Sequence, residues 1–161
     1  MAQLERRHLH EWVYACTMLN ISAHTHIMRE THCYRMLLNR GSRKISALYD
    51  EALAPLGVTI GQFNMMRVIV SMEPVSVTDL ANYVELDRST VGRNGRVLER
   101  MELVKMSSQG VDQREARLSL TEKGHQVVRR GLPLWDSVQL GVEERLGPEK
   151  ARQLQRLLAS L

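Results

Sequence analysis

Residues 88–96 combine arginine, asparagine and hydroxyl side chains along one face of a predicted short helix. Arginine can donate two hydrogen bonds to a guanine edge, and asparagine can pair similarly with adenine, each giving ~1–3 kcal/mol of discrimination. Hydroxyls and further guanidinium groups can reach phosphate oxygens. The side chains expected to make such contacts are Arg88, Ser89, Thr90, Arg93, Asn94 and Arg96.

The sequence lacks the residue arrangements that catalysis requires. It contains no G-x-S-x-G motif, no phosphate-binding glycine loop, no His-Glu-x-x-His motif and no paired carboxylates in a plausible cleft. We therefore expect a binding protein without a cofactor, not an enzyme.

Two short helices and a hairpin are predicted to position these side chains. A weak capping box at residues 76–79 opens the first helix, and Asp87 is expected to cap a second helix that runs to about Met101. Residues 103–107 and 116–120 then alternate apolar and polar side chains around a glycine-containing turn, which is typical of a β-hairpin. A helix-turn-helix followed by a hairpin is the order of a winged helix.

The rest of the chain has helical periodicity. Apolar residues recur at three- and four-residue steps from residue 4 to about 20, and a second helix is expected from about 26 to 53. The capping box Thr59-x-x-Gln62 predicts a third helix to about Ser71. Thr121 should cap a long helix with a bend near Pro133, and residues 147–148 should open the last helix.

Length and composition favour one mainly α-helical unit with a small β-wing. We expect residues 1–54 to supply an N-terminal extension and first core helix, 55–121 the winged lobe, and 122–161 a long helix and a C-terminal dimerisation helix. The charge of +4 and a pI near 9.4 favour a polyanionic partner. Two cysteines, no signal peptide and no apolar run of ~18 residues favour a cytoplasmic protein without disulfides or a membrane span.

Several motifs together resemble the MarR-type winged helix-turn-helix transcriptional regulators, over residues 48 to about 135. The most specific is Asp112-x-Arg114 followed by Leu120-Thr121-x-x-Gly124, which is similar to the wing signature of that family. The other matches are Leu56-Gly57-Val58-Thr59 with Gln62, Asp79-Leu80-Ala81, Asp87-Arg88-Ser89-Thr90-Val91 with Arg93-Asn94, and Leu98-Glu99-Arg100-Met101-Glu102-Leu103-Val104.

The resemblance implies a transcriptional regulator that binds double-stranded DNA and acts as a repressor. It implies that Arg114 enters the minor groove and that Asp112 orients nearby arginines. We expect Arg93 and Asn94 to read bases, and Lys105 and Arg117 to contact the DNA backbone. For Arg96, and for Arg100 outside this set, a solvated face or ion pairs within the helix is the alternative.

The resemblance also implies a homodimer in which the first and last helices interlock, and a pseudo-palindromic operator. Apolar residues near both ends of the chain suit such an interface, although ordinary core packing is the alternative. Half-sites should lie about one helical turn, ~10 base pairs, apart. These apolar residues are Trp12, Val13, Leu132, Leu134, Leu146, Leu154, Leu157 and Leu158.

A small aromatic or phenolic acid is the ligand that the resemblance implies. An arginine beside adaptable methionines suits a carboxylate on an apolar body, whereas packing methionines and surface arginines are the alternative. The residues considered for this ligand site are Met36, Arg40, Arg43, Met65, Met66 and Ile69.

Two other signals remain open. Cys33 lies near Arg29, His32 and Arg35, cationic residues that could favour a reactive thiolate, and a buried inert thiol is the alternative. His24, His26 and His32 with Cys33 could ligate a metal, but no carboxylate accompanies them at a compelling spacing, so no metal site is predicted.

Gly92 and Gly95 are a departure from the family pattern, because each should cost the predicted recognition helix about 1 kcal/mol relative to alanine. Gly95 lies on the inward stripe of that helix. Its consequence is either closer packing of a neighbouring element or an unfilled hole.

Overall fold

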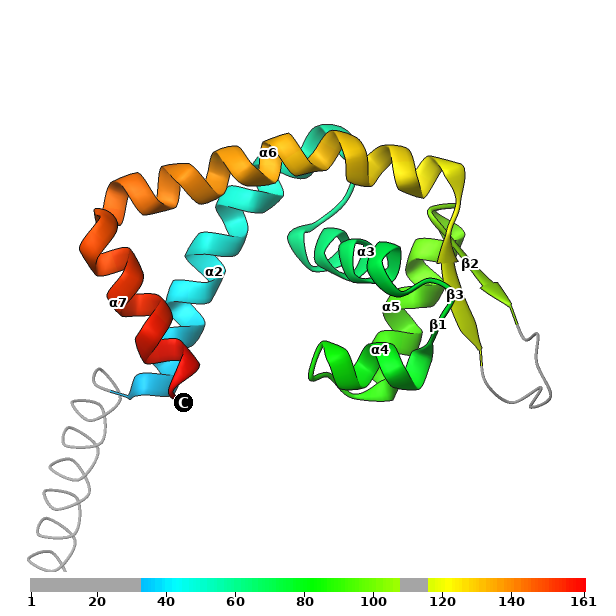
Figure 1. The fold of residues 1–161 in the computed structure, drawn as a ribbon, viewed down its shortest axis with the longest axis horizontal. Helices are drawn as coiled ribbons and strands as arrows, with labels where there is room; N and C mark the ends of the chain where they lie inside the picture. The colour runs from blue at the N-terminus through cyan, green and yellow to red at the C-terminus, as the bar shows by residue number, and fades with distance from the viewer. Residues whose placement is uncertain (1–32, 108–115) are drawn as a thin grey trace, which may run out of the picture. The chain divides into compact units, whose positions relative to one another are not determined.

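A computed structural model of the chain describes residues 33–107 and 116–161, and Figure 1 shows how their helices and strands are labelled. The chain divides into two units, Met1–Ile45 and Ser46–Leu161. Of the first unit, the described part is Cys33 and the start of helix α2 (Tyr34–Leu53). The predicted helix from residue 4 to about 20, with Trp12 and Val13, lies outside the described residues.

The predicted end of the second helix near residue 53 and the predicted third helix after Thr59 are confirmed. The predicted start near residue 26 is wrong, since Cys33 is not helical and α2 begins at Tyr34. Helix α2 ends at Leu53, and the 3-10 turn η1 (Ala54–Leu56) follows, closed by Gly57 at a φ of 71°. Helix α3 (Ile60–Met72) begins with the predicted capping box, in which the Thr59 hydroxyl accepts from the Gln62 amide and the Gln62 side chain accepts from the Thr59 amide.

The helix-turn-helix consists of α4 (Val77–Tyr83) and α5 (Arg88–Arg100). The Ser76 hydroxyl caps α4 by accepting from the Asp79 amide at 3.0 Å. Asp87 occupies the N-cap position of α5 as predicted, but its side chain forms no capping hydrogen bond. The side-chain cap expected there is therefore wrong, although the start of the helix is right.

The predicted hairpin is formed by β2 (Val104–Ser107) and β3 (Arg117–Leu120), with Val104 opposite Leu120 and Ser107 opposite Arg117. A third strand, β1 (Val75–Ser76), pairs with the other edge of β3, giving the antiparallel order β1-β3-β2. The sequence did not predict β1, because two residues are too short to display alternation.

Helix α6 (Glu122–Leu146) begins at Thr121, whose hydroxyl accepts from the Gly124 amide at 3.0 Å, as predicted. It remains one helix through Pro133. Helix α7 (Pro148–Ala159) begins with a proline in its first turn, also as predicted, and packs on α6. The fold class, mainly α with a small β-wing, is confirmed.

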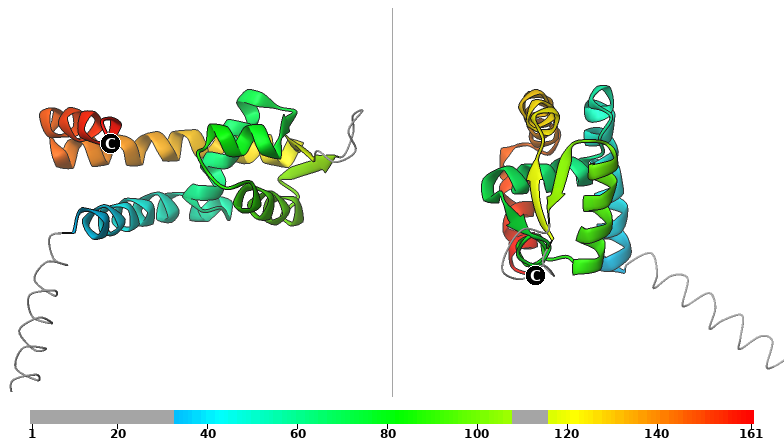
Figure 2. Two further views of the ribbon diagram at one scale, coloured as in Figure 1. Left: turned by 90° about the horizontal axis from the view of Figure 1, so that it is seen from below. Right: turned by 90° about the vertical axis from the view of Figure 1, so that its right-hand side faces the viewer.

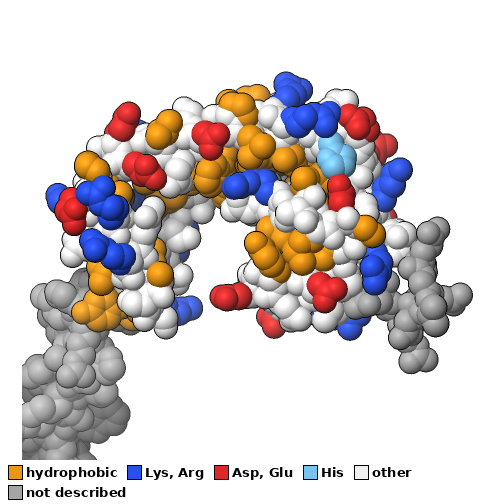
Figure 3. All heavy atoms as spheres, viewed as in Figure 1, with side chains coloured by type: hydrophobic (Ala, Val, Ile, Leu, Met, Phe, Trp, Pro, Cys, Tyr) orange, Lys and Arg blue, Asp and Glu red, His pale blue; other side chains and the backbone are white. Residues whose placement is uncertain are grey.

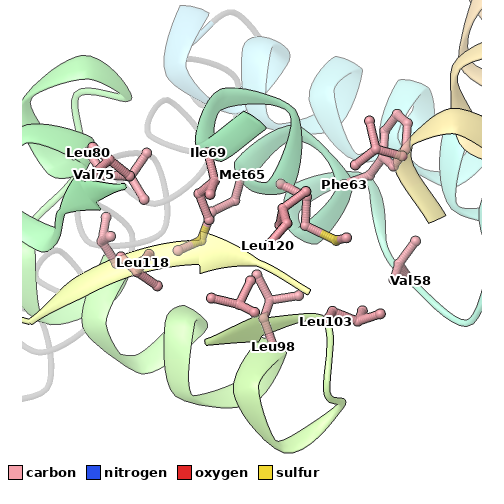
Figure 4. Close-up of a cluster of buried hydrophobic side chains, with 14 of the residues drawn as sticks. Val58, Phe63, Met65, Ile69, Val75, Leu80, Leu98, Leu103, Leu118 and Leu120 are labelled. Carbon is pink, nitrogen blue, oxygen red and sulfur yellow. The ribbon is translucent and has the colours of Figure 1, made fainter. Parts of the chain in front are cut away.

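One hydrophobic core holds the winged lobe together (Figure 4). Helix α3 contributes Phe63 and Ile69, helix α4 contributes Leu80, helix α5 contributes Leu98, and strand β3 contributes Leu118, all fully buried. Because every element of the lobe places a side chain in this core, the recognition helix and the hairpin share one support.

Within residues 33–107 and 116–161, no single helix is both long and apolar enough to cross a membrane. The bent pair 34–56 and 60–72 reaches that length and composition only when its two helices are taken together.

Candidate nucleic-acid interface

Helix α5 separates an apolar face from a polar one. Val91, Gly95 and Leu98 are buried against the lobe. Thr90 is half-buried, and its hydroxyl lies 3.4 Å from an Arg93 Nη atom that donates to it. The predicted DNA-contacting residues that are exposed on this helix are Arg88, Ser89, Arg93, Asn94 and Arg96.

The hairpin lies alongside α5, as both views in Figure 2 show. Lys105 on β2 and Arg117 on β3 are exposed there. Asp112 and Arg114, the predicted orienting acid and wing arginine, lie outside the described residues. The structure thus brings the α5 residues and the two strand cations into one lobe, while the roles of Asp112 and Arg114 stay predictions.

A hollow of about 790 Å³ opens beside the contact between α5 and the sheet. Helix α5 lines it with Arg88, Ser89, Gly92, Arg93 and Arg96, and the side next to the sheet is lined by Val77, Met106 and Ala116. Four of the predicted DNA-contacting residues, three of them arginines, therefore line one concave surface.

The basic side chains of this surface have no internal counter-charge among the described residues. The ion pairs found in residues 33–107 and 116–161 involve Lys123, His125, Arg129, Arg152 and Arg156, and none involves an arginine of α5. Exposed guanidinium groups that are not neutralised by a neighbouring carboxylate attract phosphate. The electrostatics of this surface favour a polyanion.

Glu99 was not identified from the sequence, yet it ties the recognition helix to the hairpin. Its Oε1 atom accepts a hydrogen bond of 3.2 Å from the Met106 amide on β2. A glutamate on the exposed side of a basic helix gives no local signal of such a role, because its partner is seven residues away on another element. Glu99 positions the hairpin relative to α5.

The environment of Gly95 decides between the two consequences expected from the sequence. A Cβ atom at this position would lie 3.0 Å from Leu118 Cδ2 and 3.6 Å from the Met106 sulfur. The glycine therefore allows strands β2 and β3 to pack closely on α5, and no hole is left there.

A second group of polar and aromatic side chains joins α2, α3 and α6. The Arg67 guanidinium lies 4.3 Å from the centre of the Trp135 ring, and the Tyr49 ring lies 6.0 Å from that of Trp135. The Tyr49 hydroxyl donates to Gln139, which in turn donates to Glu143 at 3.0 Å. Burial raises the pKa of Tyr49, the Glu143 carboxylate raises it further, and Arg67 offsets part of that rise.

Arg67 also borders a smaller hollow of about 380 Å³ between α3 and α4, together with Asn64, Val68, Ser71 and Tyr83. The sequence did not single out these residues. A cation–π contact depends on two helices that are distant in the chain, so no spacing could have revealed it.

The residues predicted for an acid ligand divide into two groups. Met65, Met66 and Ile69 are buried in the core of the lobe, and a role for them in ligand binding stays a prediction. Met36, Arg40 and Arg43 are exposed on the first part of α2.

The predictions about thiol and metal sensing concern the start of the chain. Cys33 is a free, half-buried thiol, whereas His24, His26 and His32 lie outside the described residues. Among residues 33–107 and 116–161, no three His, Cys, Asp or Glu side chains lie close enough together to hold a metal ion.

Comparison with known proteins agrees with this geometry. Residues 62–124 match a family model described as a winged helix DNA-binding domain. The chain is 26% identical over 137 residues to the HTH-type transcriptional regulator MgrA of Staphylococcus aureus, covering 84% of this chain and 90% of MgrA.

Among solved structures, the chain is similar to the M. tuberculosis transcriptional regulator MosR in complex with DNA. The two are 33% identical with a TM-score of 0.68, covering 78% of this chain and 92% of MosR. A mutant of MarR from E. coli in complex with operator DNA shares the fold, with a TM-score of 0.72 at 21% identity over 78% of this chain and 90% of that one. These relatives are regulators, so the expectation that the chain is not an enzyme is confirmed.

Proposed function

The chain belongs to the MarR family of DNA-binding transcriptional regulators, and we propose that it is a repressor that a small aromatic or phenolic acid releases from a pseudo-palindromic operator. It binds this operator as a homodimer, with one α5 helix in each of two successive major grooves. The observation that carries the proposal is the exposed stripe of arginine, asparagine and serine on α5, which borders a basic hollow.

Base reading and backbone binding are assigned to different elements. Arg93 and Asn94 are exposed on α5 and have the side chains that pair bidentately with guanine and adenine. Lys105 and Arg117 are exposed on the strands of the hairpin, and a cation there neutralises phosphate whatever the base sequence. Arg114, between those strands in sequence, is assigned to the minor groove by family resemblance.

This division of roles is tested by two alanine variants in a DNA-binding titration at several salt concentrations. The probe is a duplex that the wild-type chain selects from a random-sequence library, and a scrambled duplex is its control. Arg93→Ala should lose about 1–3 kcal/mol on the selected duplex alone. Lys105→Ala should weaken binding to both duplexes and lower the salt slope by about one. Equal losses on both duplexes from both variants would contradict the division.

The homodimer is supported by apolar side chains that the described residues leave uncovered. Leu140 on α6 and Leu154, Leu157 and Leu158 on α7 are exposed, and hydrophobic side chains can be seen between the charged ones on these helices in Figure 3. A regulator of this size has little core in which to bury them, so a second copy is the expected cover. Two-fold symmetry then requires a symmetric operator.

The acid ligand is assigned to Arg67 and the hollow beside it. The guanidinium supplies a fixed cation for a carboxylate, and Asn64, Ser71 and Tyr83 supply polar groups around it. Because Arg67 also contacts Trp135 on α6, a ligand here would act on the contact between the lobe and α6. A coupling of ~1–3 kcal/mol would change operator affinity by five- to a hundredfold.

The ligand assignment is tested with 4-hydroxybenzoate, and with 4-hydroxybenzyl alcohol as a neutral analogue of similar shape. The acid should raise the melting temperature of the wild-type chain and release the selected duplex, whereas the alcohol should do neither. Arg67→Met keeps an unbranched side chain of similar length and should abolish both effects of the acid. If Arg67→Met responds to the acid as strongly as the wild-type chain does, Arg67 is not part of the ligand site.

A further inference from the structure

Two glycines three residues apart in α5 have opposite surroundings. A Cβ atom at Gly95 would press on Leu118 and Met106, so packing inside the lobe explains that glycine. A Cβ atom at Gly92 would meet no atom within 4 Å among the described residues. Glycine in a helix interior is destabilising relative to alanine, and nothing within the described lobe requires it at Gly92.

Gly92 lies at the centre of the surface assigned to DNA. Arg88 and Arg96 are four residues before and after it, so the three share one stripe of the helix. All three line the hollow beside α5. The stripe therefore has a notch, a position without a side chain, between two long cationic side chains.

We infer that Gly92 is a specificity-determining residue, at which a base edge on the floor of the major groove comes into contact with the backbone of α5. This inference rests on the proposed reading of DNA by that helix. The arginines on either side reach outward, toward phosphates or guanine edges, while the notch lets the helix axis lie closer to the bases. Any side chain at position 92 would hold the helix away from one base pair.

The test separates fold stability from DNA binding, because the two should move in opposite directions. Gly92→Ala removes a helix-weakening residue in open space, so its melting temperature should rise by about 2–4 °C. On a duplex selected by the wild-type chain from a random-sequence library, its affinity should fall about ten- to a hundredfold, the effect of losing one base contact. Affinity for a scrambled duplex should be unchanged. Gly92→Thr should lose more than Gly92→Ala.

Gly61→Ala is the control, because Gly61 is also a helical glycine whose added Cβ would meet nothing within 4 Å among the described residues. It lies on α3 rather than on the stripe, so its DNA affinity should equal that of the wild type.

A repeated selection with Gly92→Ala provides the second measurement. A change of preference confined to one base pair in each half-site supports the inference. Undiminished affinity of Gly92→Ala for the selected duplex would overturn it, and so would equal losses on selected and scrambled duplexes, which would place a phosphate at the notch. Failure of the wild-type chain to select any duplex would instead refute the proposed function.

Discussion

At the scale of single residues, the effect of a glycine in a helix depends on what surrounds its missing side chain. Gly95 is buried between α5 and the strands, and the nearest side chain, Leu118, is fully buried and held by the core. A methyl group added there would have to displace Leu118 or push α5 away from the hairpin. Gly92 has no such neighbour among the described residues.

Gly95→Ala should therefore lower the free energy of unfolding, although alanine is the better helix former. Overpacking lowers the free energy of unfolding by about 1–3 kcal/mol, whereas the higher helix propensity of alanine raises it by about 1 kcal/mol. The net loss of stability should therefore be up to about 2 kcal/mol. Urea denaturation monitored by circular dichroism measures it, with Gly92→Ala as the comparison variant. A Gly95→Ala protein as stable as Gly92→Ala would show that Leu118 can move aside at little cost.

The sequence could predict which residues share the exposed face of a helix, because the 3.6-residue periodicity that places them there is a local property. Exposure of Arg93 and Asn94 followed from that periodicity. The hydrogen bond of Glu99 to Met106 and the stacking of Arg67 on Trp135 join elements distant in the chain, and no local pattern encodes them. The same limit explains why the sequence could not show that Met65 and Met66 belong to the core of the lobe.

At the scale of elements, one carboxylate joins three of them. Glu73, just after α3, accepts a hydrogen bond of 2.7 Å from the Leu120 amide at the end of β3, and its other oxygen lies 3.1 Å from His125 Nε2 on α6. Both side chains are partly buried. Glu73 therefore fixes the end of the hairpin and the first turns of α6 to the end of α3.

Glu73→Ala should lower the free energy of unfolding by about 1–3 kcal/mol, because it leaves the Leu120 amide without its acceptor. Glu73→Gln should cost less, since the amide oxygen still accepts from Leu120 while the charge opposite His125 is lost. Chemical denaturation of the three proteins at neutral pH gives the comparison. Equal losses in the two variants would mean that the charge, not the hydrogen bond to the strand, is what stabilises this junction.

The start of α6 offers a prediction about pH. A hydrogen bond of 2.8 Å donated by Arg129 is the main cause of a lowered pKa at Glu122, and a weaker one from Gln126 adds to it. Since the folded pKa is depressed, the unfolded carboxylate takes up its proton at a higher pH. The stabilisation is thus present above the unfolded pKa and is lost as pH falls through the folded one.

Arg129→Ala should return the pKa of Glu122 toward that of a free glutamate, while Gln126→Ala should move it less. Carboxyl chemical shifts followed by NMR across the acidic range report both values. An unchanged titration of Glu122 in Arg129→Ala would show that the hydrogen bond is not maintained in solution.

Helices and strands could be predicted from the sequence where residues close in the chain determine them. The capping residues Thr59, Ser76 and Thr121 each act on an amide three residues away, so their helices were predicted with the right starts. Strand β1 exists because β3 lies beside it, with Val75 opposite Leu118, and this pairing spans more than forty residues. Its two residues carry no alternation of their own.

At the scale of the whole molecule, the operator recognition proposed above requires association of two copies, because one α5 helix would read only a half-site. The exposed apolar side chains of α7 are the described feature that a second copy would cover, with Leu157 at 57% exposure and Leu158 at 47%. Burial of a leucine side chain contributes about 1.5–3 kcal/mol to the free energy of association. In a symmetric dimer each substitution occurs twice in the interface, so its effect is doubled.

Leu157→Lys should consequently shift the chain from dimer to monomer and weaken binding to a full operator far more than to a single half-site. Gln153→Lys adds the same charge to an exposed position of the same helix and should leave both properties unchanged. Light scattering after size-exclusion chromatography gives the mass, and titration of full and half operators gives the affinities. A Leu157→Lys protein that stays dimeric and binds the full operator normally would place the interface away from this face of α7.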